Sequence, residues 1–111
     1  MTEAAIQREI LEAVGALPGV QVWRTAAICA YLPDGRGGYR PIWPLPVGWP
    51  DLTAIVDGWA LAVEVKRPGG RMSGQQRRMQ GLWQSAGGVW VVATSAQDAL
   101  DAVAALRGRA R

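Results

Sequence analysis

Histidine and phenylalanine are absent from this 111-residue sequence, which contains a single cysteine, Cys29, and a single lysine, Lys66. Without histidine there can be no Ser-His-Asp or Cys-His nucleophile system, no HEXXH zinc site and no ββα-metal nuclease. One cysteine cannot form an internal disulfide, and we expect Cys29 to be a small buried apolar residue. Any catalysis must therefore use carboxylates, lysine, arginine, amides or a bound cation.

Long hydrophobic runs are also missing. No apolar stretch approaches the ~20 residues that span a bilayer, and the sequence does not open with a signal-peptide pattern. Hydrophobic residues make up 50% of the chain and charged residues 19%, which is typical of a folded protein. The length favours one domain over residues 1–111. We expect a soluble, cytoplasmic protein.

Basic residues outnumber acidic ones, 12 to 9, which gives a net charge of +3. All of the basic residues except Lys66 are arginines. Because the sequence is also rich in alanine and glycine, part of this excess reflects the codon usage of a GC-rich genome. The basic balance still favours a polyanionic partner such as nucleic acid, since the arginine fork binds phosphate in bidentate fashion.

Hydrophobic spacing and turn residues predict an α/β protein in the order α-β-β-β-α-β-α, with a mixed sheet. Thr2, Ser73 and Ser95 are typical helix N-caps, and Asp57-Gly58 is the strongest hairpin signal. The run VWVVAT is typical of a strand buried on both faces. Helices are expected over 2–17, 73–86 and after Ser95, and strands over 20–30, 51–56, 60–67 and 89–94.

Residues 32–50 have a different composition, with five prolines and four glycines. We expect no regular element there, but a long loop that contains Trp43 and Trp49. Loops of this length in compact domains are usually functional or mobile. The alternative is a packed connector whose tryptophans cover the edge of the core.

The residues best suited to chemistry are Asp51, Glu64 and Lys66. Glu64 and Lys66 are two apart on an expected strand, so they share one face, and the hairpin brings Asp51 alongside. Two carboxylates beside a lysine form a site for a hard cation such as Mg²⁺, which can activate water at a phosphodiester. The alternative is a Glu-Lys pair on a solvated sheet face. The placement of the only lysine here favours the first interpretation, because lysine and arginine handle protons differently.

Further motifs accompany this group. Gly48-x-Pro50-Asp51 precedes Glu64-x-Lys66, then come the turn Gly69-Gly70 and Gln76 at a helix start, and Glu3 lies near the start of the first helix. As a set, these motifs resemble the VRR-NUC (virus-type replication-repair nuclease) family of the PD-(D/E)XK superfamily. The resemblance covers essentially the whole chain. It implies a restriction-endonuclease-like α-β-β-β-α-β core, with a central mixed sheet flanked by helices.

The resemblance also implies site roles. Asp51 and Glu64 would ligate Mg²⁺ or Mn²⁺, with the Val65 carbonyl as a further ligand. Lys66 would position the water, Gln76 would contact the water or the phosphate, and Glu3 would complete the site through water. DNA contacts are expected from Arg24, which resembles an arginine on the family's first strand, and from Arg67, Arg71 and Arg77.

Several of these residues have structural alternatives. Ser73-x-x-Gln76 is a capping box, so the alternative role of Gln76 is to cap the helix N-terminus and nothing more. Glu3 is favoured in a first helical turn by the helix dipole alone, and Glu9 competes for its role. Gln75 is a weaker substitute for Gln76, and Arg24 can equally be a paired surface arginine.

The resemblance therefore implies a metal-dependent DNA endonuclease, structure-specific for branched DNA such as a Holliday junction. It also implies a homodimer of phage or bacterial origin, in which the loop tryptophans can form the interface. Two alternatives remain open. One is a non-catalytic DNA-binding subunit, and the other is a phage accessory protein whose sheet is an interaction platform.

Overall fold

The computed structural model describes residues 1–26 and 30–109. Cys29, and part of the strand expected over 20–30, therefore lie outside the described residues. In the described part, no helix is both long and apolar enough to cross a membrane. The helices are α1 (Glu3–Gly15), α2 (Gly74–Ser85) and α3 (Ala96–Arg107), and the strands are β1 (Val20–Arg24), β2 (Ala30–Pro33), β3 (Tyr39–Ile42), β4 (Leu52–Val56), β5 (Trp59–Val65) and β6 (Val89–Ala93).

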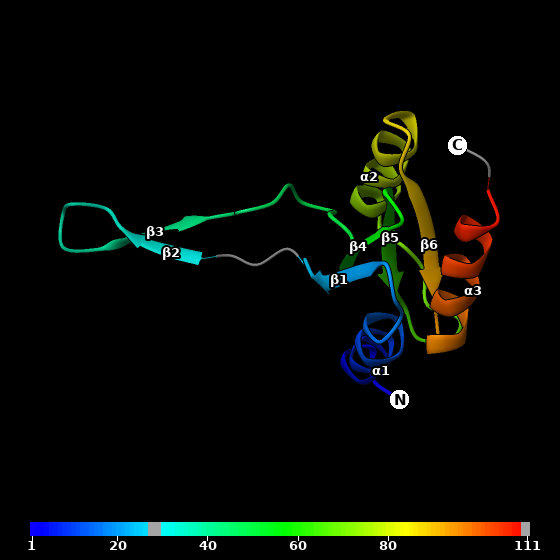
Figure 1. Ribbon diagram of the computed structural model, residues 1–111. Coiled ribbons are helices and arrows are strands. Elements are labelled where there is room, and N and C mark those ends of the chain that lie inside the picture. The colour runs from blue at the N-terminus through cyan, green and yellow to red at the C-terminus, as the bar shows by residue number, and fades with distance from the viewer. Residues whose placement is uncertain (27–29, 110–111) are drawn as a thin grey trace.

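Four strands form a mixed sheet in the order β1-β4-β5-β6. The first two pairings are antiparallel and the β5–β6 pairing is parallel. A parallel pair needs a crossover connection, and α2 supplies it on one face of the sheet. Helices α1 and α3 lie together on the opposite face (Figure 1). The body is thus a three-layer α/β arrangement in the expected α-β-β-β-α-β-α order.

The β4–β5 hairpin turns at Asp57-Gly58, as expected. Both residues have positive φ angles, 49° and 87°, as a two-residue type I′ turn requires. Asp57 also accepts a hydrogen bond from Arg107 Nε at 3.0 Å, within an ion pair. The last turn of α3 is thereby tied to the hairpin.

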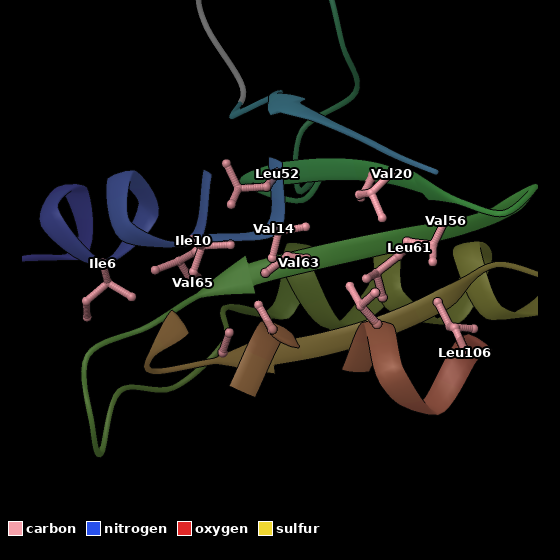
Figure 2. Packing of buried hydrophobic residues seen from close by; sticks show 14 residues of the cluster. Ile6, Ile10, Val14, Val20, Leu52, Val56, Leu61, Val63, Val65 and Leu106 are labelled. Atoms are coloured by element: carbon pink, nitrogen blue, oxygen red, sulfur yellow. The ribbon is translucent and has the colours of Figure 1, made fainter. Parts of the chain in front are cut away.

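The main core lies between the sheet and the α1/α3 layer (Figure 2). The strict alternation of β5 explains it, because Leu61, Val63 and Val65 all point to this face and are almost fully buried. Each such side chain contributes roughly 1.5–3 kcal/mol when it leaves water. The other face of β5 carries Ala62, which packs with Met79 and Trp90 beneath α2.

The expectation of a structureless loop over 32–50 is wrong for its first half. Strands β2 and β3 pair antiparallel from Ala30↔Ile42 to Pro33↔Tyr39, and this hairpin, called the arm here (residues 30–42), projects well away from the body (Figure 1). The carboxylate of Asp34 accepts the N–H groups of Arg36 and Gly38 and so closes the turn. Prolines are tolerated because both strands of a two-stranded ribbon are edges.

Candidate functional site

Asp51 and Glu64 face each other across two antiparallel strands. The register pairs Leu52 with Val63, so its continuation by one residue sets Asp51 opposite Glu64. Directly opposed residues have their Cβ atoms roughly 4.5–5.5 Å apart on the same face. That face is the one covered by α2, as the burial of Ala62 against this helix shows.

The carboxylate of Asp51 accepts a main-chain donor from the end of β5. Asp51 follows Pro50 and lies just outside β4. Its Oδ2 accepts the Val65 N–H at 2.9 Å. The main chain is held as well, since the Thr25 N–H donates to the Asp51 carbonyl at 2.8 Å and the Thr25 hydroxyl to the Pro50 carbonyl at 3.0 Å. Asp51 is therefore fixed on both its backbone and its side chain.

Glu64 is a buried carboxylate with incomplete compensation. Its side chain is 1% exposed, and its Oε1 accepts a hydrogen bond from Gln76 Nε2 at 2.9 Å. Its Oε2 is also buried but has no hydrogen-bond partner among the described residues. Burial first, and then the adjacent carboxyl group of Asp51, raises the pKa of Glu64 from 4.5 to about 8, while the charge of Lys66 lowers it by less.

Lys66 begins the segment that follows β5. Its backbone N–H donates to the Ala93 carbonyl at 3.0 Å, which extends the pairing with β6. Its Nζ lies 3.9 Å from Glu64 Oε1, and its side chain is 13% exposed. The ammonium group thus lies beside Glu64, and a small part of the Lys66 side chain reaches solvent.

Gln76 forms the capping box and also contacts Glu64. Its Oε1 accepts the Ser73 N–H at 2.8 Å while the Ser73 hydroxyl accepts the Gln76 N–H, so the capping box is complete. The amide nitrogen remains free to donate, and it donates to Glu64. The cap therefore orients this amide toward the carboxylate, and the contact of Gln76 with water or phosphate stays a prediction.

Glu3 is placed apart from this group. It is exposed in the first turn of α1 and lines a surface hollow with Arg67, Pro68, Gly69 and Gly70. Among the described residues, no third acidic, histidine or cysteine side chain joins the two carboxylates in a group able to hold a metal. Glu9 is also exposed.

The four candidate DNA-binding arginines are all exposed. Arg24 is the last residue of β1 and pairs with Leu52, the residue that follows Asp51. Arg67 and Arg71 lie in the segment between Lys66 and α2. Arg77 lies in the first turn of α2, where its Nη2 donates to the Met72 carbonyl at 3.3 Å.

Sequence reasoning missed a hydrogen-bonded cluster beside Asp51. The hydroxyl groups of Thr25 and Thr53 lie 2.7 Å apart, and Trp49 Nε1 donates to the Thr53 hydroxyl at 3.2 Å. Together these contacts clamp the base of the arm to β4. The signal in the sequence was Thr53, a single polar residue within the otherwise apolar strand LTAIV.

A steric constraint explains why the Gly48-x-Pro50-Asp51 motif has glycine at position 48. Gly48 has a φ of 88°, and a Cβ at this position would lie 2.5 Å from the backbone oxygen of Gln75. The segment that leads into Asp51 therefore passes in close contact with the N-terminal turn of α2. This approach sets the distance between the helix that carries Gln76 and the strand entry that carries Asp51.

The residues present fit a hard divalent cation. Two adjacent carboxylates and a backbone carbonyl are the oxygen donors that Mg²⁺ and Mn²⁺ prefer. The unpartnered Oε2 of Glu64 supplies a lone pair directed at no protein donor among the described residues. The raised pKa of Glu64 reflects its burial first and the adjacent carboxylate of Asp51 second, which together outweigh the opposing charge of Lys66.

Comparison with known proteins identifies the fold. No family model matches the sequence, and no curated protein matches it. A solved structure described as a VRR_NUC domain is similar with a TM-score of 0.64 and 22% sequence identity, over 92% of this chain and 94% of that chain. The chain has the fold of a VRR_NUC domain. The expected restriction-endonuclease-like core, with helices on both faces of a central mixed sheet, is thereby confirmed.

Within the VRR_NUC fold, Asp51, Glu64 and Lys66 lie at the end of the central antiparallel pair, under the first turn of α2. The arm lies between β1 and β4 in the chain, and residues 43–50 connect it to Asp51. The likeness covers nearly the full length of both chains.

Proposed function

We propose that this protein is a Mg²⁺- or Mn²⁺-dependent nuclease that hydrolyses phosphodiester bonds of DNA. The observation that carries the proposal is the buried, incompletely compensated carboxylate of Glu64 opposite Asp51, with Lys66 and Gln76 in contact. The likeness of this chain's fold to a VRR_NUC domain supports a nuclease-type activity, as does its basic charge balance.

In this proposal Asp51, Glu64 and the Val65 carbonyl hold the cation. Bound there, the cation would supply Lewis-acid activation of water and charge stabilisation at the scissile phosphate. The chain's own residues prepare the site. The Val65 N–H and Thr25 hold Asp51 in place, and the capped Gln76 holds Glu64.

Lys66 is the residue proposed to act on the substrate. Its ammonium stands at the edge of the carboxylate pair and is partly open to solvent. From there it can orient the attacking water and neutralise the charge that develops on the phosphoryl oxygens. Glu3 would complete the site through water, and Arg24, Arg67, Arg71 and Arg77 would contact the phosphates of the substrate.

We further propose branched DNA as the substrate and a homodimer as the active form. A chain of 111 residues offers little surface to hold two duplexes at once, and a second copy would double it. The 54% exposed side chain of Trp43 is a candidate interface residue. Such a nuclease, of phage or bacterial origin, would act in the cytoplasm, where its DNA lies.

A cleavage assay tests the activity. Labelled duplex, flap and four-way-junction DNA would be incubated with the protein in Mg²⁺, Mn²⁺ or EDTA, beside Asp51→Asn, Lys66→Ala and the control Glu12→Gln on the exposed face of α1. We expect cation-dependent cutting that the first two substitutions abolish and the control retains. Tight, salt-sensitive binding without cutting in any cation would instead indicate a non-catalytic DNA-binding subunit.

Sedimentation tests the assembly. We expect a dimer, free or bound to DNA. A monomer under both conditions would refute the homodimer, and failure to bind either DNA or a cation would favour an accessory interaction protein.

A further inference from the structure

Thr25 and Trp49, which flank the arm in the sequence, are both held close to Asp51. The N-terminal side of the arm follows Thr25, whose N–H is bonded to the Asp51 carbonyl, and its C-terminal side returns through Trp49, which donates to Thr53. From this clamped base the ribbon extends outward past the sheet (Figure 1), and the longest dimension of the molecule is 54 Å. A polymer bound at Asp51 therefore passes the base of the arm.

The two faces of the arm differ. The register pairs Tyr31 with Pro41 and Pro33 with Tyr39, so these four residues share one face. The tyrosines are 67% and 71% exposed. They are diagonal neighbours, a relation that separates residues by roughly 7–8 Å. One face of the arm thus presents two separate aromatic rings to solvent, framed by rigid prolines.

The charge of the arm is positive where it faces solvent. Arg36 lies in the turn and Arg40 on the second face, opposite Leu32. The only acidic residue in the described arm is Asp34, and its carboxylate is engaged by the turn N–H groups. Positive charge in the turn and on the second face therefore accompanies exposed aromatic rings on the first face, and both features are found in surfaces that bind single-stranded nucleic acid.

We propose that the arm binds an unpaired stretch of the DNA substrate that leads away from the scissile phosphate. Tyr31 and Tyr39 stack on unpaired bases, while Arg36 and Arg40 attract the phosphates. Within a duplex, paired bases bury their faces in the helical stack, so apart from the duplex ends a tyrosine ring stacks on unpaired bases. The proposal rests on the proposed function and names its substrate class, which is duplex DNA that adjoins a single-stranded segment.

Binding without cleavage provides the test. Fluorescence anisotropy in EDTA would compare blunt duplex, single-stranded and flap DNA for the full chain, for the double variant Tyr31→Ala/Tyr39→Ala and for Tyr31→Phe/Tyr39→Phe. Leu32→Ala, on the opposite face, is the matched control. We expect the alanine pair to weaken binding to flap and single-stranded DNA by at least roughly tenfold. The phenylalanine pair and Leu32→Ala should stay within about threefold of the parent chain.

Three results would overturn the proposal. The first is unchanged binding of the alanine pair to flap DNA, and the second is an equal loss on blunt duplex, which would indicate a groove or phosphate contact. The third is a dimeric parent chain that becomes monomeric in the alanine pair, which would make the arm a protein interface. Because the assay omits the cation, a chain that never cuts can still show tyrosine-dependent binding, and a chain that cuts can still lack it.

Discussion

Replacing Glu64 by glutamine is expected to stabilise the cation-free protein at neutral and alkaline pH. Burial, and next the neighbouring Asp51, raise the pKa of Glu64 to about 8. Glutamine has the shape of the protonated carboxyl group. Its oxygen can still accept the hydrogen bond from Gln76, and its amide can donate toward Asp51. The variant therefore keeps the contacts of the neutral form and loses only the buried charge.

The sign and size follow from the two pKa values. In the unfolded chain Glu64 ionises near pH 4.5, and in the folded protein near pH 8. Between these values the folded state binds more protons, so the free energy of unfolding falls as pH rises, by about 1.4 kcal/mol per pH unit at most. Across the window this loss is on the order of 5 kcal/mol, a large fraction of the stability of a small domain. Glu64→Gln has no ionisable group at this position, so its free energy of unfolding does not show this loss.

Urea unfolding followed by tryptophan fluorescence in EDTA, from pH 4 to 9, measures this difference. The variant and the parent should have similar stability near pH 4, and the variant should gain steadily up to pH 8. Glu12→Gln, which removes an exposed carboxylate from α1, should show no such trend. A gap between variant and parent that does not change with pH, or one that shrinks as pH rises, would refute the reasoning about the buried charge.

Three further outcomes are expected. Mg²⁺ should raise the melting temperature of the parent chain more at pH 8 than at pH 5, because it binds the ionised carboxylates. In a thermal scan, Asp51→Asn should reduce this gain. An equal gain at both pH values would contradict cation binding by Asp51 and Glu64. Thr53→Val should lower the free energy of unfolding by about 1–3 kcal/mol, since it leaves buried partners unpaired, whereas Thr53→Ser should retain most of it in urea unfolding. Gly48→Ala should lower the free energy of unfolding by at least ~1–3 kcal/mol, because residue 48 has a positive φ and its Cβ would meet the Gln75 carbonyl. A variant with the same melting temperature as the parent chain would exclude this close contact.

The body of the fold could be predicted because its signals are local and mutually consistent. Ile6, Ile10 and Val14 recur at helical spacing and are buried, and the alternation of β5 assigns Glu64 to the face opposite the main core. The Asp57-Gly58 turn fixes the register, and the register in turn sets Asp51 opposite Glu64. Each step depends on residues close together in the sequence.

The arm and its clamp could not be predicted in the same way. Prolines and glycines indicate loops by composition, but the turn at Asp34 depends on one carboxylate that accepts two specific N–H groups. The contact between Thr25 and Thr53 joins positions that the arm separates in the sequence. The position of Glu3 depends on how α1 packs on the sheet, which helical periodicity alone does not determine.

The central claim is that Asp51, Glu64 and Lys66 form a cation-dependent nuclease centre. Single-turnover cleavage of labelled flap DNA, with Mg²⁺ or with EDTA, tests it most directly when Asp51→Asn and Glu12→Gln are assayed beside the parent chain. The account predicts cutting that needs the cation, persists in Glu12→Gln and falls by at least ~10²-fold in Asp51→Asn, whose side-chain oxygen can still accept the Val65 N–H and preserve the fold. Cutting by Asp51→Asn at the parent rate, or cutting that survives EDTA, would contradict it.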